Sequence, residues 1–306
     1  MNHHIKILFL VAILTISTGS LQAQQDPQYT QYMYNTMSVN PAYAGTSGVF
    51  RIIGLHRSQW VNLEGAPKTQ TLGVDTSLGK RTGLGINIIN DIRGPARETY
   101  FDANFSYTIP TGVHTSLSFG LKAGARLFNV DFSKGTSEQQ GDPNLQNIDS
   151  KILPSFGAGI YLHHDTKWYL GLSVPNVLTS DYYNDNLQRV AEEQLHFFLI
   201  GAYVFDLTDA VKFKPAFLGK AVNGAPLSVD FSANFLIHNR LTLGVAYRWD
   251  DAVSALAGIQ VNQGLFIGYG YDYTTSELKN VSNGSHELML RFDFVRKGRI
   301  KSPRFF

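Results

Sequence analysis

The sequence contains no cysteine in its 306 residues. This absence excludes a disulfide framework, thiolate metal ligands and a cysteine nucleophile. Charge is also scarce, because charged residues make up 16% of the chain and the formal net charge is only +2. Such a nearly neutral chain has no overall attraction for nucleic acid or acidic partners. Without disulfide bonds, the fold must gain its stability from some other source.

Continuous hydrophobic sequence is limited to the start of the chain. After residue 23, no stretch comes near the ~20 consecutive apolar residues that a membrane-spanning helix needs. The run from Ile7 to Ile16 follows Lys6 and leads into small residues ending at Ala23, a pattern typical of a secretory signal peptide. We expect residues 1–23 to be cleaved after export, with an uncleaved anchor as the alternative.

Recognisable catalytic and cofactor motifs are absent. No G-x-S-x-G, P-loop or H-E-x-x-H pattern occurs, and GLGIN at 83–87 lacks the third glycine of a dinucleotide site. His163 and His164 are adjacent in a predicted strand, so their side chains point to opposite faces. Asp250 and Asp251 are typical of a polar turn. We predict a protein that is not an enzyme and has no catalytic residue, metal or cofactor.

Alternation with a period of two residues is the main pattern that is present. Between 101 and 109 the residues Phe, Ala, Phe, Tyr and Ile alternate with Asp, Asn, Ser and Thr. A strand turns successive side chains to opposite faces, and the wall of a membrane barrel needs an apolar outer face and a small or polar inner one. Closed barrels can cross a bilayer because closure pairs every backbone group. A soluble sandwich also alternates.

Glycine on the non-apolar face favours the barrel. Such glycines are costly in a solvent-facing strand but suit a crowded interior. They are Gly83, Gly85, Gly157, Gly159, Gly268 and Gly270.

About 14 segments have strand character, an even number, as in single-chain outer-membrane barrels. They lie near residues 48–58, 68–78, 82–90, 97–109, 114–132, 152–163, 168–175, 194–206, 211–221, 227–237, 240–249, 252–261, 264–275 and 285–295. We predict an all-β, transmembrane, antiparallel up-and-down β-barrel over residues 48–296.

The connections alternate between long and short. Long ones lie around 59–67, 133–151, 176–193 and 276–284, and the connection at 250–251 is an exception. Since such barrels have short periplasmic turns and long external loops, the pattern places both chain ends in the periplasm.

Charged residues occur among the predicted inward positions. They either pair with one another or line a pore, and we favour pairing. They are Asp102, Lys122, Arg126, Asp230, Arg248, Asp272, Arg291 and Asp293.

Residues 25–45, QDPQYTQYMYNTMSVNPAYAG, are not strand-like, and they closely resemble the start of mature PorP/SprF family proteins. The resemblance continues through HRSQWVNLEGAPKTQTLGVDTSLG at 56–79, SFGLKAGARLFNVDFSKG at 118–135 and GYGYDYTTSEL at 268–278. It implies an outer-membrane component of the type IX secretion and gliding machinery of Bacteroidetes. The implied partners are the translocon, the periplasmic ring, peptidoglycan-associated proteins, the outer-membrane lipid and a secreted adhesin or other cargo, but no nucleic acid.

Three segments are candidates for partner binding. Residues 24–47 are expected to fold against the periplasmic mouth or into the lumen as a plug, anchored by Tyr29, Tyr32, Tyr34 and Tyr43, with a disordered leader as the alternative. The loop around Trp60 either touches cargo or is simply a stable loop. The tail, residues 297–306, and the residue before it form a basic end that either binds an acidic periplasmic partner or is solvated. Its basic residues are Arg296, Lys297, Arg299, Lys301 and Arg304.

Three other functions use similar sequence patterns. An outer-membrane porin or solute transporter is the main alternative, because it has the same wall and differs only in lumen and plug. An outer-membrane enzyme and a soluble secreted β protein follow.

Overall fold

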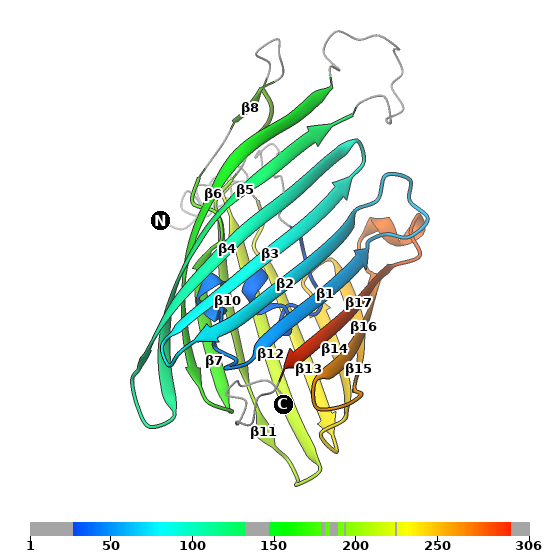
Figure 1. Cartoon of the computed structure of the whole chain (residues 1–306). Helices are drawn as coiled ribbons and strands as arrows, with labels where there is room; N and C mark the ends of the chain where they lie inside the picture. Colours follow the sequence, from blue (N-terminus) through cyan, green and yellow to red (C-terminus); the bar gives the residue numbers. More distant parts are fainter. Residues whose placement is uncertain are drawn as a thin grey trace, which may run out of the picture.

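The computed structural model describes residues 27–131, 147–178, 181–183, 189–192, 194–223 and 225–294. The chain forms one closed antiparallel barrel with strongly tilted strands (Figure 1). Its sheet contains 15 strands, and β11 (Phe205–Asp206) prolongs β10 beside β12, so the wall has 14 positions. Pairing of β1 with β17 and of β10 with β12 closes the ring. The predicted barrel of about 14 strands is therefore confirmed.

The wall strands follow one another in chain order. They are β1 (Phe50–Ser58), β2 (Lys68–Leu78), β3 (Thr82–Arg93), β4 (Ala96–Pro110), β5 (Thr115–Val130), β6 (Ile148–His164), β7 (Trp168–Val174), β10 (His196–Tyr203), β12 (Val211–Val222), β13 (Ser228–Ile237), β14 (Leu241–Arg248), β15 (Ala252–Gln260), β16 (Leu265–Thr274) and β17 (Ser285–Phe294). Between β7 and β10, β8 (Asp181–Tyr183) and β9 (Arg189–Glu192) form a separate small sheet that the sequence did not predict.

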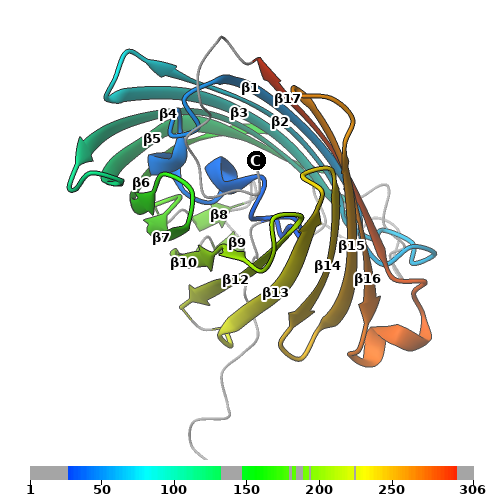
Figure 2. The same cartoon turned by 90° about the horizontal axis from the view of Figure 1, so that it is seen from below.

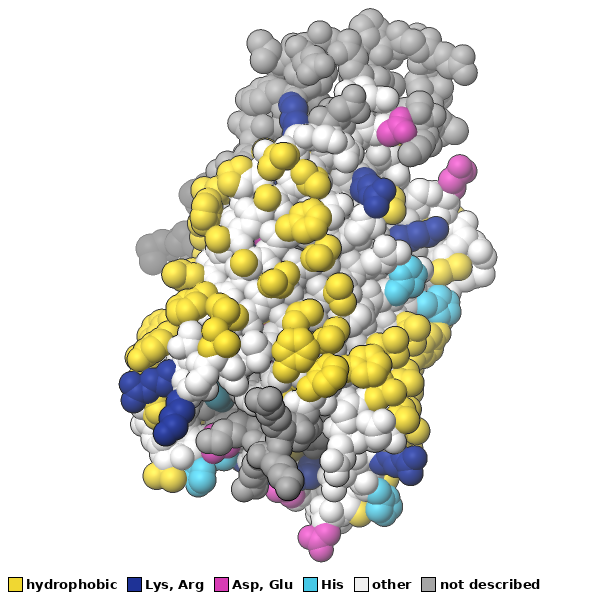
Figure 3. Space-filling model, viewed as in Figure 1, with side chains coloured by type: hydrophobic (Ala, Val, Ile, Leu, Met, Phe, Trp, Pro, Cys, Tyr) yellow, Lys and Arg dark blue, Asp and Glu magenta, His cyan; other side chains and the backbone are white. Residues whose placement is uncertain are grey.

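Side-chain burial follows the two-residue period. On β4, Phe101 and Phe105 are each 44% exposed, whereas Asp102 and Asn104 between them are buried. The outer wall therefore carries a broad hydrophobic surface (Figure 3), which suits the acyl chains of a bilayer. On β4 the polar residues Asp102 and Asn104 face inward.

The two ends of the barrel differ in their connections. Residues 59–67, 131–147, 175–195 and 275–284 connect strands at one end, which we call the long-loop end. The other end, the short-turn end, has the brief connections 79–81, 111–114, 165–167, 207–210, 238–240 and 261–264. By the usual asymmetry of such barrels, the long-loop end is external and the short-turn end is periplasmic.

One connection at the long-loop end differs from the expectation. The sequence suggested a six-residue gap between the third and fourth strands, but β3 and β4 continue to Arg93 and Ala96 and leave only residues 94–95 as a turn. Asp91, which the sequence placed in this gap, is buried because it faces the lumen.

Helical structure is sparse in the described chain. Its 3-10 helices include η2 (Thr36–Ser38), η3 (Pro41–Tyr43) and η5 (Glu277–Asn280). The side chain of Asn40 starts η3 by accepting a hydrogen bond from the backbone N–H of Ala42 at 3.0 Å, and Pro41 is already restricted to a helical φ. Within the ranges given above, no helix is long and apolar enough to cross a membrane.

Candidate functional site: a lumen filled by the N-terminal segment

Residues 27–49, here called the plug segment, lie inside the barrel (Figure 2). They pack against inward side chains from many strands and form a core where a channel would otherwise run. The buried members from the plug segment are Tyr29, Tyr32, Met33, Tyr34, Met37, Val39, Ala42, Tyr43 and Ala44. The wall contributes Ile53, Leu55, Tyr161, Tyr169, Phe198, Ile200, Phe266 and Met289 among others.

The plug segment crosses the lumen lengthwise. Near its start, Thr30 binds Asp272 and Glu287, which lie at the long-loop ends of β16 and β17. Near its end, the carbonyl oxygen of Ala44 accepts a hydrogen bond from the Ser106 hydroxyl at 2.6 Å, close to the short-turn end of β4. The segment therefore runs from the external end to the periplasmic end before β1 turns back.

This direction corrects one expectation from the sequence. The loop pattern placed both chain ends in the periplasm, and β17 does end at the short-turn end with Phe294. Pro27, however, lies among residues of the external connections, beside Trp60 and Asp250. The loop count missed this extra crossing because the plug segment has no strand pattern.

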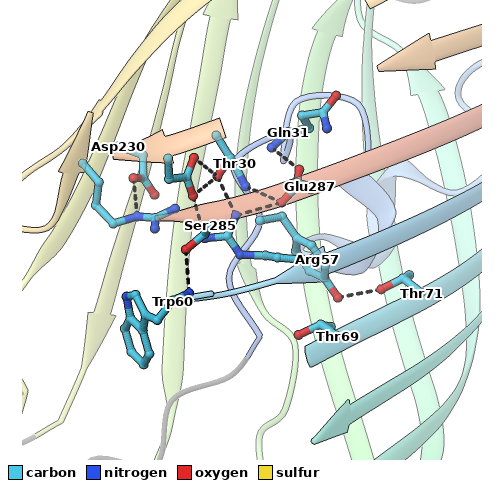
Figure 4. A network of polar contacts seen from close by, with 12 residues as sticks. Thr30, Gln31, Arg57, Trp60, Thr69, Thr71, Asp230, Ser285 and Glu287 are labelled. Atoms are coloured by element: carbon cyan, nitrogen blue, oxygen red, sulfur yellow. Dashed lines mark hydrogen bonds and ion pairs between the residues drawn. The ribbon is translucent and has the colours of Figure 1, made fainter. Parts of the chain in front are cut away.

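A cluster around Arg57, here called the Arg57 cluster, holds the part of the plug segment near the long-loop end (Figure 4). The Arg57 guanidinium lies 2.7 Å from Asp272 and 3.2 Å from Glu287, and it donates to the Thr30 hydroxyl at 2.8 Å. Glu287 also accepts hydrogen bonds from the backbone N–H groups of Thr30 and Gln31, at 2.9 and 2.8 Å. Because these groups are buried, each charge depends on its partners.

A second cluster, around Arg51, holds the part of the plug segment near the short-turn end. The guanidinium of Arg51 is 2.7 Å from the Asp293 carboxylate and donates to the Tyr43 hydroxyl at 2.6 Å. Asp75 accepts a hydrogen bond from the backbone N–H of Gly45 at 3.1 Å. Arg51 and Asp75 are almost completely buried. The plug segment is thus fixed by charged wall residues near both of its ends.

Inward glycines make room for this segment. A Cβ at Gly83 would collide with the carbonyl group of Ala44, and one at Gly120 would collide with the backbone of Ala42. Gly45 itself has φ +68°, and a Cβ there would lie 2.6 Å from the Cα of Gly83. These close approaches explain why the inner face carries glycine. The inward glycines were the main sequence signal that the lumen is crowded.

The inward charges predicted from the sequence are paired. Lys122 lies 3.2 Å from Asp102, and Arg248 lies 2.7 Å from Asp230. Arg126 pairs with Glu98 at 3.8 Å. The remaining three take part in pairs already described or in the 3.1 Å pair of Arg291 with Asp293, so the structure favours pairing over a charged pore lining.

The four predicted tyrosines all belong to the filled lumen. The Tyr29 hydroxyl lies 2.8 Å from the Thr71 hydroxyl, and the Lys214 ammonium lies 5.0 Å from the Tyr34 ring centroid. Tyr32 and Tyr43 are also buried, with Tyr43 packed edge-on against Tyr161. Partner binding by these side chains stays a prediction, and in this conformation they contact the wall.

Trp60 lies at the external mouth. Its backbone N–H donates to the Ser285 hydroxyl at 3.1 Å, and Val61 exchanges backbone hydrogen bonds with residues 283 and 284 (Figure 4 shows Trp60 and Ser285). The loop is therefore tied to the β16–β17 connection. An open hollow at this end is lined by Pro27, Gln28, Gln59, Trp60, Leu63, Glu64, Arg93, Leu227, Trp249 and Asp250 among others.

The basic tail residues Arg296, Lys297, Arg299, Lys301 and Arg304 lie outside the described residues. Across the described ranges, no group of three or more His, Asp or Glu side chains is placed to hold a metal ion.

The wall and lumen define an outer-membrane β-barrel whose interior is occupied by its own chain. The sequence profile of the type IX secretion system membrane protein PorP/SprF family matches residues 21–292, and the chain belongs to this family. No curated protein sequence matches it.

Similar solved structures are outer-membrane barrels. The CymD monoaromatic hydrocarbon channel is 11% identical with a TM-score of 0.51, over 86% of this chain and 94% of that one. The P. putida toluene transporter TodX is 9% identical with a TM-score of 0.49, over 86% and 94% of the two chains. Omp33 of Acinetobacter baumannii is 9% identical with a TM-score of 0.44, over 82% and 100%. At such identities, the likeness concerns the fold alone.

Proposed function

We propose that this outer-membrane protein assists the export or surface attachment of a partner adhesin or other cargo of the type IX secretion machinery. Membership of the PorP/SprF family supports a role in that machinery. The filled lumen supports a role through binding rather than through conduction of solutes. We further propose that a signal peptide, residues 1–23, directs export and is cleaved.

The observation that carries the proposal is the Arg57 cluster. It fixes the plug segment through three buried ionic groups and two backbone N–H groups. Displacing the segment would remove the hydrogen bonds that Thr30 and Gln31 make with these buried charges, which is costly in a low-dielectric interior. A barrel closed in this way is suited to hold or orient a protein partner.

The hollow at the external mouth is the proposed place of cargo contact. Its rim includes Trp249 and Leu227, which are 66% and 65% exposed, together with Trp60. Tryptophan at a concave surface is typical of protein-binding sites, because it buries much area at small entropic cost; Trp249 is exposed and Trp60 is half-buried. The loop that carries Trp60 is held rigidly by its backbone hydrogen bonds.

Periplasmic partners are proposed to meet the opposite end. β17 ends with Phe294 at the short-turn end, the end that we assign to the periplasm. The basic residues Arg296, Lys297, Arg299, Lys301 and Arg304 are proposed to bind an acidic component there, whether translocon, periplasmic ring or peptidoglycan-associated protein.

A solute transporter is the second candidate. A cavity of about 60 Å³ lies in the lumen beside the plug segment, lined by apolar residues such as Ile89, Phe198 and Leu218 and by the Lys122–Asp102 pair. Its mixed lining is of the kind that binds small molecules, but its volume holds only a few water molecules, so a solute would pass only if the plug segment moved.

Deletion of the gene with a survey of surface proteins tests the proposal. We expect one or a few surface proteins to disappear while general permeability to small solutes is unchanged. Complementation with Trp60→Ala is expected to restore less cargo at the surface than Val113→Ala, a control on a periplasmic turn that is 93% exposed. An unchanged surface proteome, combined with loss of uptake of a small solute, would favour the transporter.

A further inference from the structure

The outer wall carries a polar strip on one side of its external half. The strip consists of His56, Ser58, Lys68, Gln70, Asn90, Arg97, Thr99 and His286, on β1 to β4 and β17. Their neighbours Arg57, Thr69, Asp91 and Glu98 are buried inside the barrel, so the alternation turns the strip residues outward. The strip is therefore at the surface that faces the membrane or its edge.

Strand register aligns these residues side by side. His56 is opposite Gln70, Gln70 is opposite Asn90, and Asn90 is opposite Thr99. One row further out, Ser58 pairs with both His286 and Lys68. In the same outer row, Lys68 and Arg97 flank Ile92, which is the partner of both. The strip is thus continuous over neighbouring strands.

The charge of the strip has one sign. It contains two cations, two histidines and no carboxylate. Among the ion pairs between described residues, none involves Lys68 or Arg97, although the Arg97 Nε donates to the Asn90 side-chain oxygen at 2.8 Å. That hydrogen bond orients the guanidinium on the wall. Its terminal nitrogens are suited to an anion with several oxygens.

An apolar row lies next to the strip. Across β1 to β4, the strand register places Gly54 opposite Leu72, Leu72 opposite Ile88, and Ile88 opposite Phe101. Each of these residues is two positions along its strand from a strip residue, namely His56, Gln70, Asn90 and Thr99 in the same order. Leu72 is 47% exposed and Phe101 is 44% exposed. Figure 3 shows Lys, Arg and His side chains beside hydrophobic ones on this face. Basic groups therefore adjoin a surface suited to hydrocarbon.

The opposite side of the wall lacks this arrangement. At the same external end of β14 to β16, Tyr247 pairs with Val253 and Val253 with Tyr273, all pointing outward. These three side chains are 47%, 45% and 57% exposed. The polar strip is therefore a local feature and not a uniform rim around the barrel.

We propose that the strip binds the phosphorylated headgroup of an outer-leaflet glycolipid, whose acyl chains lie along the apolar row. Lys68 and Arg97 supply the charge for the phosphate, while Gln70, Asn90 and His56 offer hydrogen bonds to phosphate or sugar oxygens. Basic residues at a membrane boundary recognise anionic headgroups in this way. The site is separate from the lumen and the external mouth.

Native mass spectrometry of the detergent-purified full chain tests the proposal, with diphosphoryl lipid A and its dephosphorylated form as probes. We expect the chain to retain the phosphorylated form preferentially. The double variant Lys68→Gln/Arg97→Gln is expected to bind it about tenfold more weakly, which corresponds to about 1.4 kcal/mol. The matched control is Lys80→Gln/Arg240→Gln, which removes two exposed cations from periplasmic turns and should bind like the unmodified chain.

Three results would overturn the assignment. Equal retention of the two lipids would show that phosphate is not recognised. Equal loss in the double variant and the control would show that the position of the charge does not matter. Displacement of the lipid by millimolar inorganic phosphate would indicate a simple anion site. Heat-modifiable migration on gels verifies that each variant is folded, and these exposed substitutions leave the lumen unchanged.

Discussion

Replacing Arg57 by methionine removes the cation that pairs with both Asp272 and Glu287 in the Arg57 cluster. The Arg57 side chain is 1% exposed, and its partners Asp272 and Glu287 are 3% and 0% exposed. Removal of one member of a buried ion pair costs about 3–5 kcal/mol, because the remaining charge has no compensation. Glu287 retains its two backbone donors, Thr30 and Gln31. We therefore expect the lower end of that range.

A destabilisation of about 3 kcal/mol changes an equilibrium by about 100-fold. Two measurements detect this destabilisation. Urea unfolding, read by heat-modifiable migration, reports the stability of the whole barrel. Labelling of Met37→Cys by a membrane-impermeant maleimide reports release of the plug segment, because Met37 is 4% exposed and the chain has no other cysteine. Arg57→Met is expected to lower the urea midpoint, to increase labelling, or both.

Two further variants separate this effect from general damage. Arg240→Gln removes an exposed charge and should change stability by less than about 0.5 kcal/mol. Adding Asp272→Asn and Glu287→Gln to Arg57→Met removes the uncompensated charges and should recover part of the loss. If Arg57→Met unfolds at the same urea concentration as the unmodified chain and Met37→Cys stays unlabelled, the cluster does not hold the plug segment.

Three other predictions concern the plug segment and the tail. Gly120→Val should destabilise the barrel by about 1–3 kcal/mol through overpacking against Ala42, whereas Gly54→Val, where a Cβ meets nothing within 4 Å, should be near neutral; equal urea midpoints would contradict the close packing. In intact cells, Gln28→Cys should react with an impermeant maleimide and Thr111→Cys only after the outer membrane is opened, because the two positions lie at opposite ends of the barrel; the reverse pattern would invert the assigned orientation. Deletion of residues 297–306 should abolish pull-down of periplasmic partners while leaving heat-modifiable migration intact, and undiminished pull-down would remove the docking role of the tail.

Most of the wall could be predicted from the sequence. The two-residue alternation at 101–109 predicted which side chains face lipid, and inward glycines such as Gly83 indicated a crowded interior. Errors occurred where inward residues are charged. Asp91 resembles a loop residue until its partners Thr69 and Arg93 are known, so β3 was predicted to end at residue 90 instead of residue 93.

The path of the plug segment could not be predicted from the sequence, for a different reason. Its position depends on contacts between distant residues, such as Thr30 with Asp272 and with Glu287, which are 242 and 257 positions apart. No local pattern encodes such pairs. The sequence could offer both the mouth and the lumen as locations, but only the three-dimensional arrangement shows that the segment enters from the external end.

A barrel that is closed by its own N-terminal segment and acts by binding should not conduct ions steadily. Conductance of the full chain in planar lipid bilayers measures this property. We expect no steady open state, with at most brief openings that become frequent in Arg57→Met. A large, steady conductance from the unmodified chain would contradict the closed lumen and would favour a solute channel.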